Sequence, residues 1–94
     1  MNQYEEIEIP ENSSGYAHEG KLFVTNVEVG VDLVIVKIGT IDYAGKPYDL
    51  RFGYPITHDG GLNGRFEVHL IAIKEGDLTA NIHASAMFRI TLLL

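Results

Sequence analysis

Two histidines and a glutamate form the combination of side chains that comes nearest to a chemical site in this chain. Residues 75–77 (EGD) have the composition of a short hairpin loop, and pairing the strands around it places His69 opposite His83, with Glu67 on the same face. Opposed residues in a sheet hold their Cβ atoms about 4.5–5.5 Å apart. Two imidazoles and a nearby carboxylate could therefore hold Zn²⁺ or a similar metal ion, as part of a metal-dependent enzyme or sensor.

Two other interpretations of this pairing stay open. The two histidines can lie side by side, both neutral, on a polar sheet face. They can also sense pH, because two adjacent imidazoles do not readily carry charge together. The spacing of His69 and His83 matches no known metal-binding motif. We therefore expect a structural role for the pair, and we predict no cofactor.

A second combination consists of two aspartates. A tight turn at Gly45-Lys46 would place Asp42 opposite Asp49, and like charges directly opposed in a hairpin are unfavourable. Arg51 lies two residues beyond Asp49 on the same face and could bridge both carboxylates. The alternative is a Ca²⁺ ion bound by the two carboxylates and by carbonyl oxygens of the turn.

Catalytic chemistry has little support in the sequence. His58-Asp59 lies in a glycine-rich stretch where a carboxylate could orient an imidazole for base catalysis, and His18-Glu19 is a similarly weak pair. No Gly-x-Ser-x-Gly or equivalent nucleophile motif accompanies them. The absence of cysteine excludes disulfides, thiolate metal sites and cysteine nucleophiles. We expect a protein that is not an enzyme.

Four aromatic side chains share one face of the second predicted hairpin. Such a face can stack sugar rings or anchor a protein partner, and it can equally form half of a sandwich core. A small carbohydrate-binding module is therefore one candidate function. The four residues are Tyr43, Tyr48, Phe52 and Tyr54.

The elements that would position these side chains are short β-type runs separated by glycine turns. Their spacing predicts an all-β single domain, a β-sandwich or small barrel of about 6–8 antiparallel strands. The alternative is an α+β fold with a C-terminal helix over residues 78–94, a segment that contains several alanines. The predicted strands cover residues 4–9, 21–29, 32–43, 65–74, 78–84 and 85–94, with a hairpin around Gly45-Lys46 and loops over 10–20 and 53–64.

Alternating patterns also predict the strand registers. The odd-numbered residues of the run over 21–29 form an apolar face, and a tight turn at Gly30 would place Val27 opposite Val34. Gly39 marks a bend at which the following strand would pass from one sheet to the other.

The net charge of −6 is unevenly distributed along the chain. Residues 1–20 carry five acids and no Lys or Arg, whereas residues 21–94 carry eight acids and seven bases. We therefore divide the chain into an acidic N-terminal segment over 1–20, which could include an edge strand, and a β-domain over 21–94. The acidic segment could solubilise the protein, dock on a partner, or mimic nucleic-acid phosphates.

The same composition limits the partners. Seven scattered basic residues do not form the cluster that phosphate binding needs, so no nucleic-acid partner is expected. No run approaches the roughly 18 apolar residues that span a bilayer. No signal peptide is visible at the N-terminus. We expect a soluble, cytoplasmic protein without a membrane partner.

Apolar strands give the main indication of function. The runs over 32–38 and 88–94 are apolar on both faces, although one face of each sheet in a small sandwich should meet solvent. We therefore expect a non-enzymatic assembly subunit that binds copies of itself or another protein, as small β-subunits of viral or phage particles do by analogy of fold. The expected interface consists of Phe88, Ile90, Leu92 and Leu94.

Overall fold

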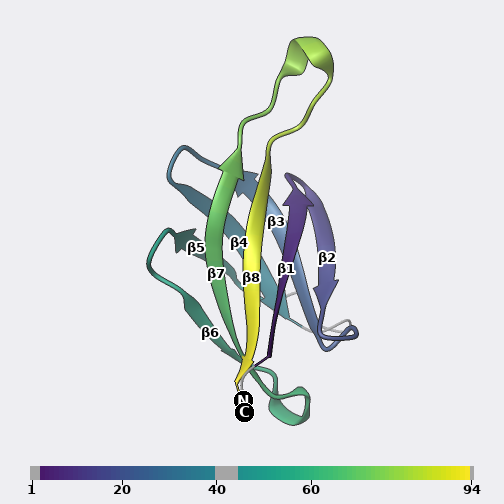
Figure 1. Cartoon of the computed structure of the whole chain (residues 1–94), viewed down its shortest axis with the longest axis vertical. Coiled ribbons are helices and arrows are strands. Elements are labelled where there is room, and N and C mark those ends of the chain that lie inside the picture. Colours follow the sequence, from purple (N-terminus) through teal and green to yellow (C-terminus); the bar gives the residue numbers. More distant parts are fainter. Residues whose placement is uncertain (1–2, 40–44, 94) are drawn as a thin grey trace.

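The chain folds into two antiparallel sheets that stack face to face (Figure 1). The computed structural model describes residues 3–39 and 45–93. The first sheet has the order β1 (Gln3–Pro10), β8 (Ser85–Leu93), β7 (Arg65–Lys74) and β6 (Ile56–Asp59). The second has the order β2 (Ser13–Ala17), β3 (Leu22–Val29), β4 (Leu33–Gly39) and β5 (Pro47–Arg51). Two single turns of 3₁₀ helix, η1 (Gly61–Asn63) and η2 (Leu78–Ala80), lie in the connections before and after β7.

The predicted fold class, an all-β domain of about 6–8 antiparallel strands, is confirmed. The alternative with a C-terminal helix is wrong, because residues 85–93 form β8 and only η2 is helical in the segment before it. β-branched and aromatic residues in strict alternation outweigh the alanines of this segment.

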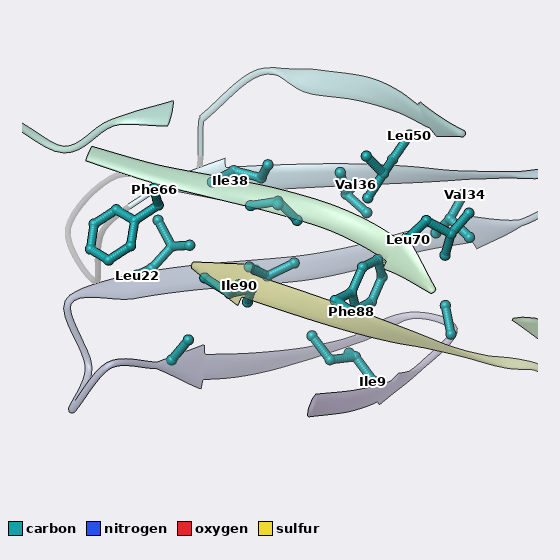
Figure 2. Close-up of a cluster of buried hydrophobic side chains, with 14 residues drawn as sticks. Ile9, Leu22, Val34, Val36, Ile38, Leu50, Phe66, Leu70, Phe88 and Ile90 are labelled. Atoms are coloured by element: carbon teal, nitrogen blue, oxygen red, sulfur yellow. The ribbon is translucent and has the colours of Figure 1, made fainter. Parts of the chain in front are cut away.

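The core lies between the two sheets and draws on both of them (Figure 2). Phe66 and Phe88 come from the first sheet, and Leu22 and Ile38 come from the second. All four side chains are at most 1% exposed. Burying each of them contributes about 1.5–3 kcal/mol, so the sandwich is held together mainly by these contacts between layers.

The first 20 residues take part in both sheets. β1 is the edge strand predicted over residues 4–9, and it pairs with β8. The loop predicted over 10–20 is wrong, because β2 forms within it and pairs with β3. Ile9 of β1 and Ala17 of β2 are buried in the core, which explains why this strongly acidic segment is ordered. The loop predicted over 53–64 likewise contains β6 and η1.

The inner face of β3 differs from the prediction. Leu22, Val24 and Asn26 are buried, whereas the odd-numbered residues are only half-buried. The turn lies one residue later than predicted, because Val29 pairs with Val34 and the Gly30 amide donates to the carbonyl oxygen of Leu33 at 2.8 Å. A bulge lies between Asn26 and Glu28. The prediction failed because both sets of alternate residues in β3 contain large apolar side chains, so the pattern could not select a face.

The hairpin predicted around Gly45-Lys46 also has another register. β5 pairs with β4, and Asp49 lies opposite Ile35 instead of Asp42. Asp42 lies outside the described residues. Arg51 extends toward Asp32 with 3.7 Å between the charged groups. The crossing between sheets that was predicted at Gly39 occurs after β5, since β6 belongs to the first sheet.

A long loop joins β7 to β8. The predicted loop at residues 75–77 is too short, because the last pair of the two strands is Lys74 with Ser85. Residues 75–84 form a protruding loop that includes η2. We call this loop the arm, and it extends well beyond the body of the sandwich (Figure 1). The strand predicted over 78–84 is absent from it.

Candidate interaction surface

The outer face of the first sheet is covered by charged side chains. Arg89 of β8 bridges Glu6 of β1 at 3.1 Å, and its guanidinium lies 5.2 Å from the centre of the Tyr4 ring. On the same face the Nζ atom of Lys74 lies 2.6 Å from Glu8 Oε1. These pairs join β1, β8 and β7 and make this face polar.

The pair of Glu8 and Lys74 perturbs the acid. The hydrogen bond from Lys74 Nζ holds the pKa of the Glu8 carboxyl below its usual value, with a smaller contribution from the hydroxyl of Ser85. Both side chains are substantially exposed, so the pair is a surface feature and adds little to stability.

The three residues predicted to hold a metal are not brought together. His69 lies opposite Arg89 instead of His83, because the register of β7 and β8 differs from the prediction. His69 Nε2 donates a 2.5 Å hydrogen bond to the carboxylate of Glu67, while His83 is exposed in the arm. Within residues 3–39 and 45–93 no group of three His, Asp or Glu side chains has the geometry of a metal site.

The outer face of the second sheet mixes apolar and charged side chains, since Ile35 lies between Glu28 of β3 and Asp49 of β5, and Leu33 lies beside Arg51. Leu33 and Ile35 of β4 point away from the core, since they alternate with the fully buried Val34 and Val36. Phe23 of β3 points outward for the same reason. All three outward side chains are only half-buried within the chain.

Two further residues complete this surface. Tyr16 of β2 lies opposite Phe23, and the ring centres are 4.9 Å apart. Lys37 lies on the same face of β4, opposite Thr25. Thr25 and Lys37 separate this ring pair from Leu33 and Ile35. We call the four side chains Tyr16, Phe23, Leu33 and Ile35 together the apolar face.

Three of the four residues of the predicted aromatic cluster are exposed at the surface. Tyr48, Phe52 and Tyr54 are 40%, 43% and 74% exposed around β5 and the turn that follows it, where Arg51 and Tyr54 form an isolated bridge. Tyr43 lies outside the described residues. The three aromatic residues with described positions are therefore at the surface and do not form half of the core.

The predicted C-terminal interface lies mostly inside the sandwich. Phe88 and Ile90 have no exposed surface and pack in the core, and Leu92 packs against it (Figure 2). These side chains alternate toward the second sheet, so a partner cannot reach Phe88 or Ile90 without unfolding the chain. Leu94 lies outside the described residues.

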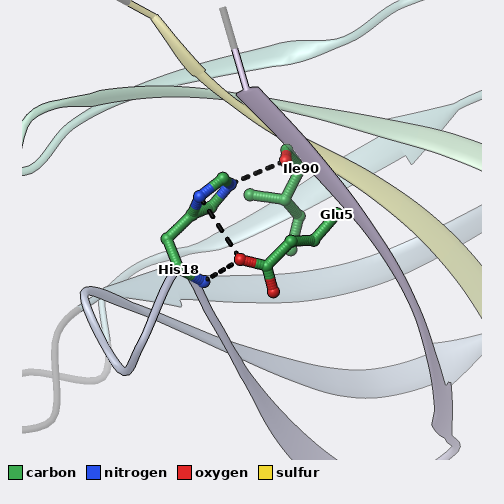
Figure 3. Close-up of polar contacts among 3 residues, drawn as sticks. All are labelled: Glu5, His18 and Ile90. Carbon is green, nitrogen blue, oxygen red and sulfur yellow. Dashed lines mark hydrogen bonds and ion pairs between the residues drawn. The ribbon is translucent and has the colours of Figure 1, made fainter.

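A buried histidine was underestimated by sequence reasoning (Figure 3). His18, in the turn between β2 and β3, is 7% exposed, and its Nε2 donates to the carbonyl oxygen of Ile90 at 2.8 Å. Its Nδ1 lies 3.4 Å from the carboxylate of Glu5, which also accepts a hydrogen bond from the His18 amide at 2.7 Å. The residue joins the two sheets, and no local pattern indicates such a contact between residues distant in sequence.

The arm is the second feature that the sequence did not indicate. Leu78 and Ile82 near its tip are 87% and 55% exposed. Each lies in a segment that was predicted as an ordinary strand, in which such residues would be paired and covered.

No family model, curated protein or solved structure matches this chain. No pocket is present in the part of the chain that the structure describes. None of the described segments forms a helix with the length and apolar character needed to cross a membrane.

Proposed function

We propose that the protein is a non-enzymatic assembly subunit that associates with copies of itself through the apolar face. The observation that carries the proposal is the difference between the two outer faces. The outer face of the first sheet is occupied by ion pairs such as Glu6 with Arg89, whereas that of the second presents the half-buried Leu33 and Ile35, with Glu28, Asp49 and Arg51 beside them. Apolar patches on a sheet surface commonly mark contacts between proteins.

The apolar face replaces the C-terminal strand as the contact surface. The sequence argument for assembly was that some strands are apolar on both faces, and the outward face of β4 does carry Leu33 and Ile35, together with Lys37. The tilted ring pair of Tyr16 and Phe23 adds aromatic area of the kind that anchors protein interfaces.

Light scattering on a sizing column tests the proposal. We expect the native chain to have a mass well above the 10.4 kDa of one copy. Ile35→Glu should return the mass to one copy, because a carboxylate on the apolar face would have to be desolvated at the contact. Thr57→Glu, an equal change of charge on the outer face of the first sheet, should keep the native mass. A native chain of 10.4 kDa at every concentration would overturn the proposal.

The exposed aromatic residues favour a second candidate, a carbohydrate-binding module. Tyr54, with 74% of its surface exposed, and the neighbouring Phe52 could stack on a sugar ring. Titration with oligosaccharides should then quench tyrosine fluorescence, and Tyr54→Ala should remove the response. Unchanged fluorescence across a panel of neutral sugars would argue against this candidate.

A further inference from the structure

The connection between β6 and β7 contains a pair of residues that can react with each other. Asn63 and Gly64 form the one Asn-Gly step in the sequence. In such a step the backbone nitrogen of the glycine can attack the side-chain carbonyl carbon of the asparagine, because glycine has no Cβ atom that would shield its nitrogen. The other asparagines are followed by Gln, Ser, Val or Ile, which carry this shield.

The fold requires glycine at this position. Gly64 has a φ of 104° and a ψ of −178°, a backbone conformation that essentially only glycine adopts. An added Cβ would also lie 3.0 Å from a methyl carbon of Leu92, which packs against the core. The carbonyl oxygen of Gly64 accepts a 2.7 Å hydrogen bond from the Gly60 amide, and this bond closes the loop before β7. The residue after Asn63 is therefore held to the one type that leaves its nitrogen open to attack.

Asn63 itself is held weakly. Its Nδ2 atom lies 3.5 Å from the carbonyl oxygen of Lys21, at the long limit for a hydrogen bond. It is the last residue of η1, a single turn without a buried residue, and the neighbouring Leu62 is completely exposed. Figure 1 shows this loop at the end of the sandwich opposite the arm. A turn with so few buried contacts opens locally at a low cost in free energy.

One hydrogen bond opposes the attack. The Gly64 amide donates to the carbonyl oxygen of Gly61 at 3.0 Å, a bond of the kind that defines a 3₁₀ turn. Local opening of η1 breaks this bond and frees the nitrogen. A reaction in the folded chain therefore proceeds from the opened turn, and its rate depends on how often η1 opens.

We propose that Asn63 is a site of spontaneous deamidation in the folded protein. A base in the solvent takes the proton of the Gly64 amide, and the nitrogen forms a bond to Cγ of Asn63. The bond from Cγ to Nδ2 breaks, and Nδ2 takes up a proton and leaves as ammonia. Water then adds to one of the two carbonyl carbons of the resulting five-membered imide and opens it. The products are aspartate and isoaspartate, and only water and a solvent base take part.

The reaction changes a contact that joins η1 to the turn between β2 and β3. Aspartate at position 63 has no N–H to offer the carbonyl oxygen of Lys21, so two oxygen atoms would face each other there. Isoaspartate also carries an extra methylene in the backbone before Gly64, which shifts the Gly64 carbonyl away from the Gly60 amide. We expect the modified loop to separate from the turn, and the formal net charge of −6 to become one unit more negative. The inference does not depend on the assembly function proposed above.

Incubation of the full chain in a mildly alkaline buffer tests the proposal. Ion-exchange chromatography should separate a more acidic form that increases with time, and tandem mass spectrometry should locate the exchange of an amide for a carboxyl at Asn63. Asn63→Gln should abolish this form, because the longer side chain would have to close a six-membered ring. Asn12→Gln, at an exposed asparagine followed by serine, should leave the rate unchanged.

The same chain unfolded in guanidinium chloride is the reference. Its Gly64 amide is free, so it should be converted several-fold faster than the folded chain, and sampling continues until it is converted. If the folded chain then shows no conversion at Asn63, the fold protects the site and the proposal is overturned. Conversion of the folded chain at Asn12 or Asn81 as fast as at Asn63 would also overturn it, because the Asn-Gly step would then have no special reactivity.

Asn63→Asp reproduces one product directly and tests the structural consequence. We expect the backbone amide NMR signals of Lys21 and Leu22 to shift relative to the native chain. Asn63→Gln, which retains a side-chain donor, should preserve them. Identical signals in the two variants would exclude the contact with Lys21 as the part of the fold that the reaction alters.

Discussion

His18 Nε2 donates a 2.8 Å hydrogen bond to the carbonyl oxygen of Ile90, and this bond joins the turn after β2 to the centre of the opposite sheet. The imidazole is also packed against Phe66, with 5.5 Å between the ring centres. A side chain from the second sheet thus satisfies a buried backbone group of the first, where a water molecule has no access.

The first prediction concerns this bond. His18→Ala removes this buried hydrogen bond to the carbonyl of Ile90, and the loss of one hydrogen bond costs about 0.5–1.5 kcal/mol. We expect a loss of this size in the free energy of unfolding, measured by urea denaturation. His83→Ala, in the exposed arm, should change it by less than about 0.5 kcal/mol. Equal stability of the two variants would show that the bond to Ile90 contributes nothing.

Asn26 gives a second prediction. Its side chain is fully buried, its amide donates to the carbonyl oxygen of Ile9 at 2.8 Å, and its own oxygen has no partner among the described residues. Asn26→Asp replaces the donor by an oxygen that faces another oxygen, and it buries a charge without a partner. We expect a loss of about 3–5 kcal/mol at neutral pH by urea denaturation. Asn81→Asp, on the arm, is the matched control and should be nearly neutral.

A substitution at Phe88 tests whether this residue belongs to the core or to an interface between chains. Its side chain is fully buried within one chain, so Phe88→Ala should lower the free energy of unfolding by about 3–5 kcal/mol. Leu93→Ala, on the partly exposed outer face of the same strand, should cost less. If Phe88→Ala dissociated an oligomer while leaving thermal stability intact, Phe88 would be an interface residue after all.

Gly45 occupies a place that a larger residue cannot fill. Its φ is +75°, and an added Cβ would lie 2.0 Å from the carbonyl oxygen of Ile38, so the backbone itself must move. Gly20 has a similar φ of +85° but nothing within 4 Å of an added Cβ. Gly20→Ala should therefore show only the left-handed backbone cost of about 1–2 kcal/mol. Gly45→Ala should melt at a clearly lower temperature in calorimetry, and equal melting temperatures would contradict the close approach.

Asp77 links pH to the shape of the arm. The hydroxyl and then the amide of Thr79 hold the pKa of Asp77 below its ordinary value of 3.8. Because the pKa of Asp77 is lower in the folded arm than in the unfolded chain, its ionised carboxylate stabilises the folded arm above pH 3.8. This stabilisation is lost as the pH falls through the lower pKa of the folded form. Thr79→Ala removes the hydroxyl, so the pKa of Asp77 should rise toward its ordinary value.

Carbon-detected NMR titration of the Asp77 carboxyl measures the effect of Thr79→Ala directly. The carboxyl of Asp59, whose hydrogen-bond donor is the amide of Gly61, serves as an internal reference because the substitution does not touch it. An Asp77 titration midpoint that is the same with and without Thr79→Ala would exclude the hydroxyl as the cause of the shift.

The sequence by itself determined the class of the fold and the position of most strands. Alternating apolar residues, interrupted by glycine, indicated β3, β7 and β8 close to their observed bounds. These signals are local, since the period of a strand and the chemistry of a turn both depend on neighbouring residues. Strands with one apolar face form sheets with one apolar face, and two such sheets bury these faces by packing against each other as a sandwich.

Only the tertiary structure decided the registers and therefore the sites. The short loop predicted at residues 75–77 would have placed Leu70 opposite Ile82, whereas the fold places it opposite Phe88 and places Val68 opposite Ile90. The observed register buries Phe88 and Ile90 completely, at about 25 cal/mol for each Å² removed from water, and this outweighs the local preference for a short turn. The same shift separates His69 from His83 and frees residues 75–84 to form the arm. His18 and the apolar face depend on which strands become neighbours, a choice made by the burial of the whole core and not by any single segment.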